Sequence, residues 1–406
     1  MKKESPLVNL LQKNGTKTVL ASLLSIFLGL VFGTILVVIV ACTSDAIPAK
    51  GGWEGVQLVL LGLFSKGRDA VGELVFGWNA KNFGNMLFRA TPLLMTGLSV
   101  AVANKTGLFN IGAAGQYLMG TWASLTVALT IPTTVVPAWI VWILAMLAGM
   151  LAGALWGAIP GLLKATRNIN EVLACIMTNW IAANLVTMLF DGSNLKNAAV
   201  GGKIGYIKPT ADNGVATAKL GLDKLTNGSQ INAGIIIAIL IAIAVYILMN
   251  KTTLGYQLRA CGSNRHAARY AGINDKRNIV LSMSIAGALA GCGAALYWLS
   301  GNTEFYWSTY QSLPAEGFNG IPVALLAANS PLGVIFSSVF MSLLNINGLQ
   351  LKTLTAYNEY VTDIIIAAIV YLSSFSLIIK MWLTQKKKKE TVQTPAPKAD
   401  DAGKEE

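Results

Sequence analysis

Two neutral amides, Asn110 and Gln116, stand in a short segment, 106–116, that joins two long apolar runs. The segment contains three glycines. They allow an unwound backbone, which is tolerated at membrane depth only against protein or a water-filled cavity. An amide both donates and accepts hydrogen bonds. The pair therefore suits an uncharged polar solute better than an ion, and an ordinary turn between two helices is the alternative interpretation.

A second group of polar residues opens the apolar run that follows residue 170. Glu171, Asn179 and Trp180 belong to it. Glu171 is placed to complement the positive N-terminal end of a helix. Asn179 lies deeper, where a buried amide in a membrane usually faces a partner or a solute path. We therefore expect Asn179 to have a functional neighbour.

A third group, in segment 316–333, combines Glu316, Phe318 and Asn319 with two prolines and three glycines. Prolines and glycines interrupt helices, and discontinuous helices near the midplane commonly form transport sites. The segment favours a place on a solute path. A re-entrant element that only packs is the alternative.

The fourth group is the basic segment 251–277, which is too short for a domain. Ser263 is a good N-cap for a short helical run that Gly272 closes. Arg265 and Arg269 are four residues apart and share one face of that run. The small residues opposite them form a smooth surface: Ala267, Ala268 and Ala271. This shape suits a groove on a soluble partner, and a solvated positive loop is the alternative.

The chain offers no set of residues for catalysis. Its one histidine is His266, and its four cysteines are far apart without a Cys-x-x-Cys pair. It has no Gly-x-x-x-x-Gly-Lys-Ser/Thr loop, so it cannot bind ATP by that device. We expect no catalytic residue, no metal and no cofactor in this chain, and no enzymatic activity of its own.

The composition indicates which elements must position these groups. Of 406 residues, 54% are hydrophobic and only 12% are charged, about half the usual charged share of a soluble domain. The apolar runs have the length of membrane helices and lack the alternation of barrel strands. We predict spans at 18–41, 86–104, 111–131, 136–163, 171–190, 233–250, 278–299 and 359–381. Region 318–347 is apolar but interrupted, and we predict a broken or re-entrant helix pair that ends on the side where it began. The interrupting residues are Pro322, Pro331, Gly333, Asn345 and Asn347.

The fold class is therefore an all-α integral membrane protein, a polytopic bundle of about 8–10 helices. Most of the basic residues lie in the N-terminal tail, the loop before residue 171, the loop 251–277 and the C-terminus. Lys and Arg favour cytoplasmic loops, so these segments and both termini are predicted to be cytoplasmic. Segments 45–85 and 191–232 then face outside. Residues 1–17 form a tail, 18–381 the transmembrane domain, and 382–406 a disordered tail.

The net charge of +12 fits this topology and does not require nucleic acid as a partner. Residues 39–42 loosely resemble a lipoprotein cleavage site, but the preceding apolar run is too long for a typical signal peptide, which favours an uncleaved first helix. Small residues four apart form stripes that permit close helix packing. They are Gly149, Gly153 and Gly157; Gly29 and Gly33; and Gly287, Gly291 and Ala295. We expect packing within the chain, with a subunit interface as the alternative.

Four stretches together resemble one family. They read TPLLMTGLSVAVANKTGLFNIGAAGQ (91–116), NEVLACIMTNWIA (170–182), TTLGYQLRACGSNRHAARYAGI (252–273) and GFNGIPVALLAANSPLG (317–333). The chain resembles the permeases of bacterial ABC importers for simple sugars, branched-chain amino acids and nucleosides. It is most similar to the larger nucleoside-type permease, over roughly residues 85–380.

The resemblance implies a nucleoside importer of the bacterial cytoplasmic membrane, driven by a separate ATPase. The partners would be a cytoplasmic ABC ATPase with two nucleotide-binding halves that holds ATP and Mg²⁺, a second related permease, an extracellular binding protein or lipoprotein, and membrane lipid. Residues 255–272 would form the coupling helix on the ATPase. Its residues would include Gly255, Arg259, Gly262, Asn264, Arg265, Ala267, Ala268, Arg269 and Gly272. Those near the path would be Asn110, Gln116, Glu171, Asn179, Trp180, Phe318 and Asn319.

Three other functions remain to be distinguished. A simple sugar such as ribose could be the cargo, because amides and glycines do not separate ribose from a ribonucleoside. An ion-coupled carrier is less favoured, because no pair of acidic residues lies mid-span. A membrane-embedded enzyme would need a cluster of nucleophile, base or metal ligands, and none is visible.

Overall fold

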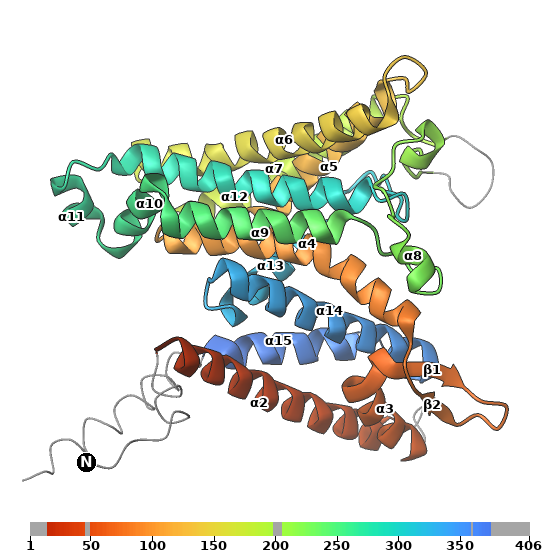
Figure 1. The fold of residues 1–406 in the computed structure, drawn as a ribbon. Helices are drawn as coiled ribbons and strands as arrows, with labels where there is room; N and C mark the ends of the chain where they lie inside the picture. Colours follow the sequence, from red (N-terminus) through yellow and green to blue (C-terminus); the bar gives the residue numbers. More distant parts are fainter. Residues whose placement is uncertain (1–13, 45–48, 198–204, 359, 375–406) are drawn as a thin grey trace, which may run out of the picture.

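The computed structural model describes residues 14–44, 49–197, 205–358 and 360–374 (Figure 1). The first part contains α2 (Asn14–Thr43), α3 (Ala49–Leu61), the 3₁₀ turn η1 (Gly62–Phe64), β1 (Ser65–Arg68), β2 (Leu74–Phe76), α4 (Ala80–Lys105), α5 (Ala113–Thr130), α6 (Ala138–Arg167) and α7 (Glu171–Asp191). The second part contains η2 (Thr210–Asn213), α8 (Leu222–Leu225), α9 (Gly234–Lys251), α10 (Thr253–Ser263), α11 (Arg265–Tyr270), α12 (Asp275–Trp298), α13 (Ala315–Leu326), α14 (Pro331–Leu354) and α15 (Tyr360–Ser374).

The helices form two groups that meet at α4 (Figure 1). One group gathers α5, α6, α7, α9 and α12, and the other gathers α2, α3, α14 and α15. Helix α4 packs against α12 on one side and against α13 and α14 on the other. Every residue of α4 from Ala90 to Val102 is buried. This enclosed helix is therefore the centre of the molecule.

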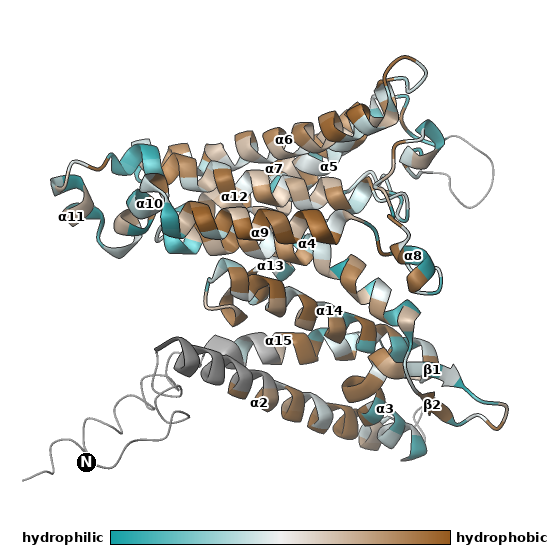
Figure 2. Cartoon of the chain, in the orientation of Figure 1, coloured by the Kyte–Doolittle hydropathy of each residue, from teal (hydrophilic) through white to brown (hydrophobic). Residues whose placement is uncertain are grey.

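Six helices in the described residues are long and apolar enough to cross a membrane: α4, α6, α7, α9, α12 and α14. Figure 2 shows apolar residues along these helices and polar residues gathered at the two ends of the bundle. This confirms the predicted polytopic helical membrane protein. We call the end with α10 and α11 the basic end. The end with α8 and the β1–β2 hairpin is the opposite end.

Asparagine side chains set where several helices begin. Asn79, Asn170 and Asn274 cap α4, α7 and α12, each by accepting a hydrogen bond from a backbone N–H of the first turn. Asparagine is favoured there because its side chain satisfies a donor that the helix leaves unpaired. At the opposite end, Arg68 of β1 forms an ion pair with Glu54 of α3, 2.6 Å between Nη2 and Oε2. Arg68 Nη2 also donates to the carbonyl of Leu354 at the end of α14, at 2.6 Å, and this contact ties the segment predicted to face outside to the bundle.

The glycine stripe of α6 packs against that of α12. A Cβ on Gly153 would overlap the carbonyl oxygen of Gly287, and a Cβ on Gly287 would overlap that of Gly153. A Cβ on Gly291 would likewise overlap the carbonyl oxygen of Gly149, and Gly33 of α2 faces Ile365 of α15. These contacts confirm that the stripes serve packing within the chain. Because glycine has no side chain, the backbones of α6 and α12 can approach this closely.

The predicted broken helix pair is present, with its break at residues 327–330. Helix α13 spans only 12 residues. Ala328 and Asn329 then take left-handed conformations, with φ of 49° and 56°. Ser330 caps α14, which runs without interruption for 24 residues, so the expectation of a further break at Asn345 and Asn347 is wrong. Within this continuous helix, the Asn347 side-chain amide donates to the Val59 carbonyl, at 2.8 Å, and so joins α14 to α3.

The remaining boundaries differ little from the prediction. Helix α2 begins at Asn14, inside the expected tail 1–17, and α15 is described to Ser374, within the span 359–381. Residues 1–13 and the expected C-terminal tail 382–406 lie outside the described residues.

A larger side chain in the glycine seam, the contact between the glycine stripes of α6 and α12, should destabilise the bundle. We expect Gly153→Val to lower the free energy of unfolding by about 3 kcal/mol, the upper part of the range for overpacking, because the new side chain meets backbone that cannot move aside. Thermal unfolding of the purified protein in detergent measures this. Leu151→Val on the exposed side of α6 is the control and should change stability little. Equal stability of the two variants would contradict the tight seam.

Candidate functional site

Asn110 is the centre of a buried amide cluster between α4 and α5. Its Nδ2 donates to Gln116 Oε1 at 2.8 Å and to Ser99 Oγ at 3.0 Å. Its Oδ1 accepts from Gln116 Nε2 at 3.1 Å and from the Gly112 N–H at 3.1 Å. The two amides thus satisfy each other and hold the glycine-rich turn.

Asn179 of α7 fixes the same turn from the other side. Its Oδ1 accepts from the Gly115 N–H at 2.9 Å, and its Nδ2 donates to the Ile111 carbonyl at 3.0 Å. The side chain is only 2% exposed. An unwound backbone inside a bundle needs such partners, because an unpaired buried peptide group costs free energy.

The structure brings three of the predicted path residues together and separates the others. Asn110, Gln116 and Asn179 form one closed network and are all buried, so their contact with a solute stays a prediction. Trp180 points away from this network and is 56% exposed. Glu171 forms an ion pair with Lys164 at the basic end, at 3.0 Å.

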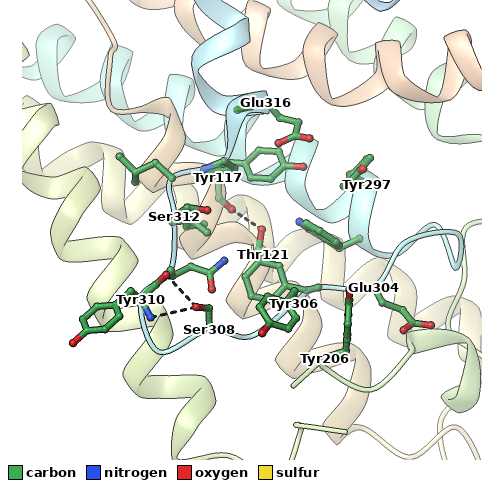
Figure 3. Close-up of a pocket in the computed structure, with 17 residues that line it drawn as sticks. Tyr117, Thr121, Tyr206, Tyr297, Glu304, Tyr306, Ser308, Tyr310, Ser312 and Glu316 are labelled. Carbon is green, nitrogen blue, oxygen red and sulfur yellow. Dashed lines mark hydrogen bonds between the residues drawn. The ribbon is translucent and has the colours of Figure 1, made fainter. Parts of the chain in front are cut away.

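The network also positions the start of α13. Gly317 lies so close to Ala114, and Gly320 so close to Thr96, that a Cβ on either would overlap backbone atoms. These contacts seat α13 against both α4 and α5. As a result, Glu316 lies beside Tyr117, the residue that follows the amide network along α5 (Figure 3). Phe318 and Asn319, predicted for the path, are half-buried and do not line the cavity described next.

A cavity of about 630 Å³ lies between α5 and the segment that joins α12 to α13 (Figure 3). A pocket of this volume accommodates a small organic molecule. It is lined by Tyr117, Leu118, Thr121, Tyr206, Tyr297, Trp298, Glu304, Phe305, Tyr306, Ser308, Tyr310, Gln311, Ser312, Leu313, Pro314, Ala315 and Glu316.

Aromatic rings form much of the cavity wall. Trp298 meets Tyr297 and Phe305 edge to face, with ring centroids 4.9 and 5.1 Å apart. Tyr206 and Tyr306 form another edge-to-face pair at 5.1 Å. Such pairs fix the orientation of each ring. This site was not expected from the sequence, although residues 297–310 are rich in aromatic residues, which is the signal that could have located it.

The charge of the cavity limits what it can hold. Among the described residues that line it, Glu304 and Glu316 are the ionisable acids, and there is no Lys, Arg or His. Arg89 of α4 acts electrostatically on Glu316 from outside the lining. An anion would find no cationic partner in the wall, so the cavity suits a neutral or cationic solute.

The basic end differs from the prediction in its helices. Segment 255–272, expected as one helix, forms α10 and α11 with a break at Asn264. Asn264, and not Ser263, caps α11 by accepting from the Ala267 N–H at 3.0 Å. The extended backbone of Asn264, with φ of −155°, cannot continue a helix.

Arg265 and Arg269 share one partner inside the chain. Both donate to the Asp275 carboxylate, at 2.7 and 2.8 Å. The hydrogen bond to Asp275 raises the pKa of Arg269 above its ordinary value. The two arginines thus hold α11 against the start of α12. The Arg269 side chain is still 59% exposed, and contact of this face with a soluble partner stays a prediction. Ala268 is 4% exposed and packs inward, so the expected smooth outer surface consists of Ala267 and Ala271 alone.

Helix α10 touches the turn that the amide network holds. A Cβ on Gly262 would overlap the Lys105 carbonyl oxygen, and Gly107, with φ of 75°, lies against the Gly262 backbone. At the other end of α10, Gly255 packs closely against the backbone of α9. A displacement of α10 would therefore press directly on the turn before Asn110. The basic end also has a hollow of about 340 Å³, lined by Lys164, Ala165, Thr166, Asn168, Arg265, His266, Arg269 and Lys276.

Comparison with known proteins identifies the family. The family model described as branched-chain amino acid transport system / permease component matches residues 82–374. This chain belongs to that permease family. The permease is 33% identical over 370 residues to a guanosine ABC transporter permease protein of Bacillus subtilis, covering 91% of this chain and 97% of the relative.

Two further relatives are named for different substrates. A nucleoside ABC transporter permease protein of Lactococcus lactis is 33% identical, covering 96% of this chain and all of the relative. A glucose ABC transporter permease protein of Haloferax volcanii is 29% identical, covering 78% of this chain and 82% of the relative. No solved structure gives a significant match.

Removing the Asn179 amide should loosen the permease. Asn179→Leu leaves the Gly115 N–H and the Ile111 carbonyl buried and unpaired, which costs about 1–3 kcal/mol for each group. We expect a lower midpoint of thermal unfolding and impaired transport. Asn184→Leu is the matched control, since Asn184 is exposed on the same helix. Unchanged stability of Asn179→Leu would mean that the amide does not hold the turn.

Neutralising Asp275 should release α11. In Asp275→Asn the ion pairs to Arg265 and Arg269 are lost, and we expect amide hydrogen exchange in residues 265–270 to speed up about tenfold or more. Arg277→Gln on the exposed face of α12 is the control. If both variants exchange at the wild-type rate, the pairs do not position α11.

Proposed function

We propose that this permease is the transmembrane subunit of an ATP-driven importer of nucleosides in a bacterial cytoplasmic membrane. Relatives named as guanosine and nucleoside permeases match it over nearly their whole lengths, which supports nucleosides as the cargo class. Both termini would lie in the cytoplasm, because the basic loops gather at the end of the bundle where α2 begins.

The observation that carries the proposal is the aromatic cavity without a cation in its described lining. A nucleoside is neutral and carries a flat base that can stack on aromatic rings. An amino acid carries a carboxylate, for which this wall offers no cationic partner. Although the family is named for branched-chain amino acid transport, the cavity of this permease therefore favours an uncharged aromatic solute.

The basic end is the proposed docking site for the ATPase, whose two nucleotide-binding halves would hold ATP and Mg²⁺. Helices α10 and α11 project there (Figure 1). The contact between Gly262 and Gly107 gives α10 a direct path to the amide network. From there, Gly317 and Ala114 connect the network to α13 and the cavity. Closure of the ATPase would be transmitted along these contacts.

The importer would need two further proteins. A second, related permease would pair with this one in the membrane, and an extracellular binding protein or lipoprotein would deliver the solute. Delivery at the opposite end fits the exposed position of Tyr306 and Tyr310 at the cavity. A cavity that binds the solute weakly is sufficient for transport if the binding protein supplies the high affinity.

A sugar importer is the second candidate, because the glucose relative is 29% identical. The two candidates differ in the role of the aromatic wall. A nucleoside uses it for stacking of the base, whereas a free sugar has no aromatic plane.

Uptake in cells tests the function. We compare labelled guanosine, uridine and ribose in cells with the whole transporter and in cells that lack only this gene. We expect loss of nucleoside uptake and unchanged ribose uptake. Collapse of the ion gradients at constant ATP should leave uptake intact, whereas ATP depletion should abolish it. Loss of ribose uptake alone would favour the sugar importer, and dependence on an ion gradient would favour a secondary carrier.

A further inference from the structure

Three polar atoms in the cavity wall are buried and have no hydrogen-bond partner: Tyr117 Oη, Trp298 Nε1 and Gln311 Oε1. Tyr117 is only 1% exposed. An unpaired buried polar group is costly, and native proteins satisfy nearly all of them. Three such groups around one cavity therefore point to a ligand that completes their hydrogen bonds.

The three atoms come from three separate elements. Tyr117 belongs to α5, Trp298 is the last residue of α12, and Gln311 lies in the segment that leads to α13. A paired indole elsewhere in the chain provides a contrast: Trp142 Nε1 donates to Thr217 Oγ1 at 3.0 Å. Among the described residues, two other buried polar atoms lack a partner, Asn232 Nδ2 and Asn347 Oδ1, and neither residue lines the cavity. Three of the five such atoms therefore belong to side chains of this one cavity.

The hydrogen-bonding directions of these groups are largely fixed. An indole N–H can only donate, an amide oxygen can only accept, and a phenol can do both. The edge of a nucleobase also has fixed donors and acceptors. A sugar hydroxyl both donates and accepts, so it would satisfy either group without being distinguished. A fixed donor and a fixed acceptor beside stacking rings are thus suited to reading a base.

We propose that the cavity is a nucleobase subsite, in which the aromatic wall stacks on the base while Trp298 Nε1, Gln311 Oε1 and Tyr117 Oη pair with its polar edge. The inference rests on the proposed function and goes further, because it gives the permease its own selectivity among nucleosides. Glu316, beside Tyr117, is placed to accept a hydrogen bond from a sugar hydroxyl (Figure 3).

Conservative substitutions test the subsite. Trp298→Phe removes the N–H and keeps an aromatic ring, and Gln311→Met removes the amide and keeps the length of the side chain. Uptake of guanosine and of uridine is measured separately in cells with the whole transporter, with external nucleoside saturating. We expect each variant to change the ratio of the two uptake rates by about threefold or more, because the lost bond contributes differently to each base.

Stability provides the second measurement. The two atoms are unpaired without solute, so their removal should leave the thermal unfolding of the purified permease unchanged. Trp142→Phe is the matched control. It breaks a hydrogen bond outside the cavity, so it should lower the unfolding temperature and keep the wild-type ratio of guanosine to uridine.

The outcomes separate this inference from the proposed function. If wild-type cells import neither nucleoside, both fail. If wild-type cells import nucleosides and both variants keep the wild-type ratio, whatever their total rates, the subsite alone is wrong. Competition decides which half of the solute is bound. We expect free uracil to inhibit uridine uptake more than free ribose does, and the reverse order would overturn the base assignment.

Discussion

The satisfaction of an unwound backbone by buried amides is the constraint on which the structure depends. The turn between α4 and α5 cannot form helical hydrogen bonds, and lipid offers none in exchange. Asn110 and Asn179 supply the missing partners, one from the turn itself and one from α7. The start of α5 is thereby fixed, and with it the positions of the residues that follow along this helix.

Two regions with different roles meet at this turn. On one side, α10 touches it through Gly262, where only glycine permits the approach. On the other side, α13 packs on α5 through Gly317 and completes the wall of the cavity. Both contacts are made by backbone atoms, without flexible side chains between them. A displacement of α10 is therefore transmitted to α5 and α13 with little loss.

The basic end shows how charge is used inside the chain. Arg265 and Arg269 converge on Asp275, which is buried at the start of α12. Such pairing aligns α11 with the bundle, so the loop is a positioned element and not a free solvated segment. The sequence indicated the common face of the arginines correctly. It did not identify Asp275 as their partner, because Asp275 reaches the arginines only once Asn274 caps α12 and fixes where that helix begins.

The sequence by itself determined the long apolar helices and their packing surfaces, but not the elements of the segments between them, such as α3 and the β1–β2 hairpin. Hydropathy marks a spanning helix locally, and small residues four apart mark a seam such as that of Gly153 and Gly287. The pattern of prolines and glycines likewise located the broken pair, although not the point of the break. Only the tertiary structure decided which polar groups satisfy each other and which have no partner within the chain. Asn110 and Asn179, which the sequence placed near the path, are hydrogen-bonded within the chain, and their contact with a solute stays a prediction. Tyr117 Oη and Trp298 Nε1, which the sequence did not single out, have no partner. Hydrogen bonding depends on the distance between groups remote in sequence, and that distance is set only when the helices pack.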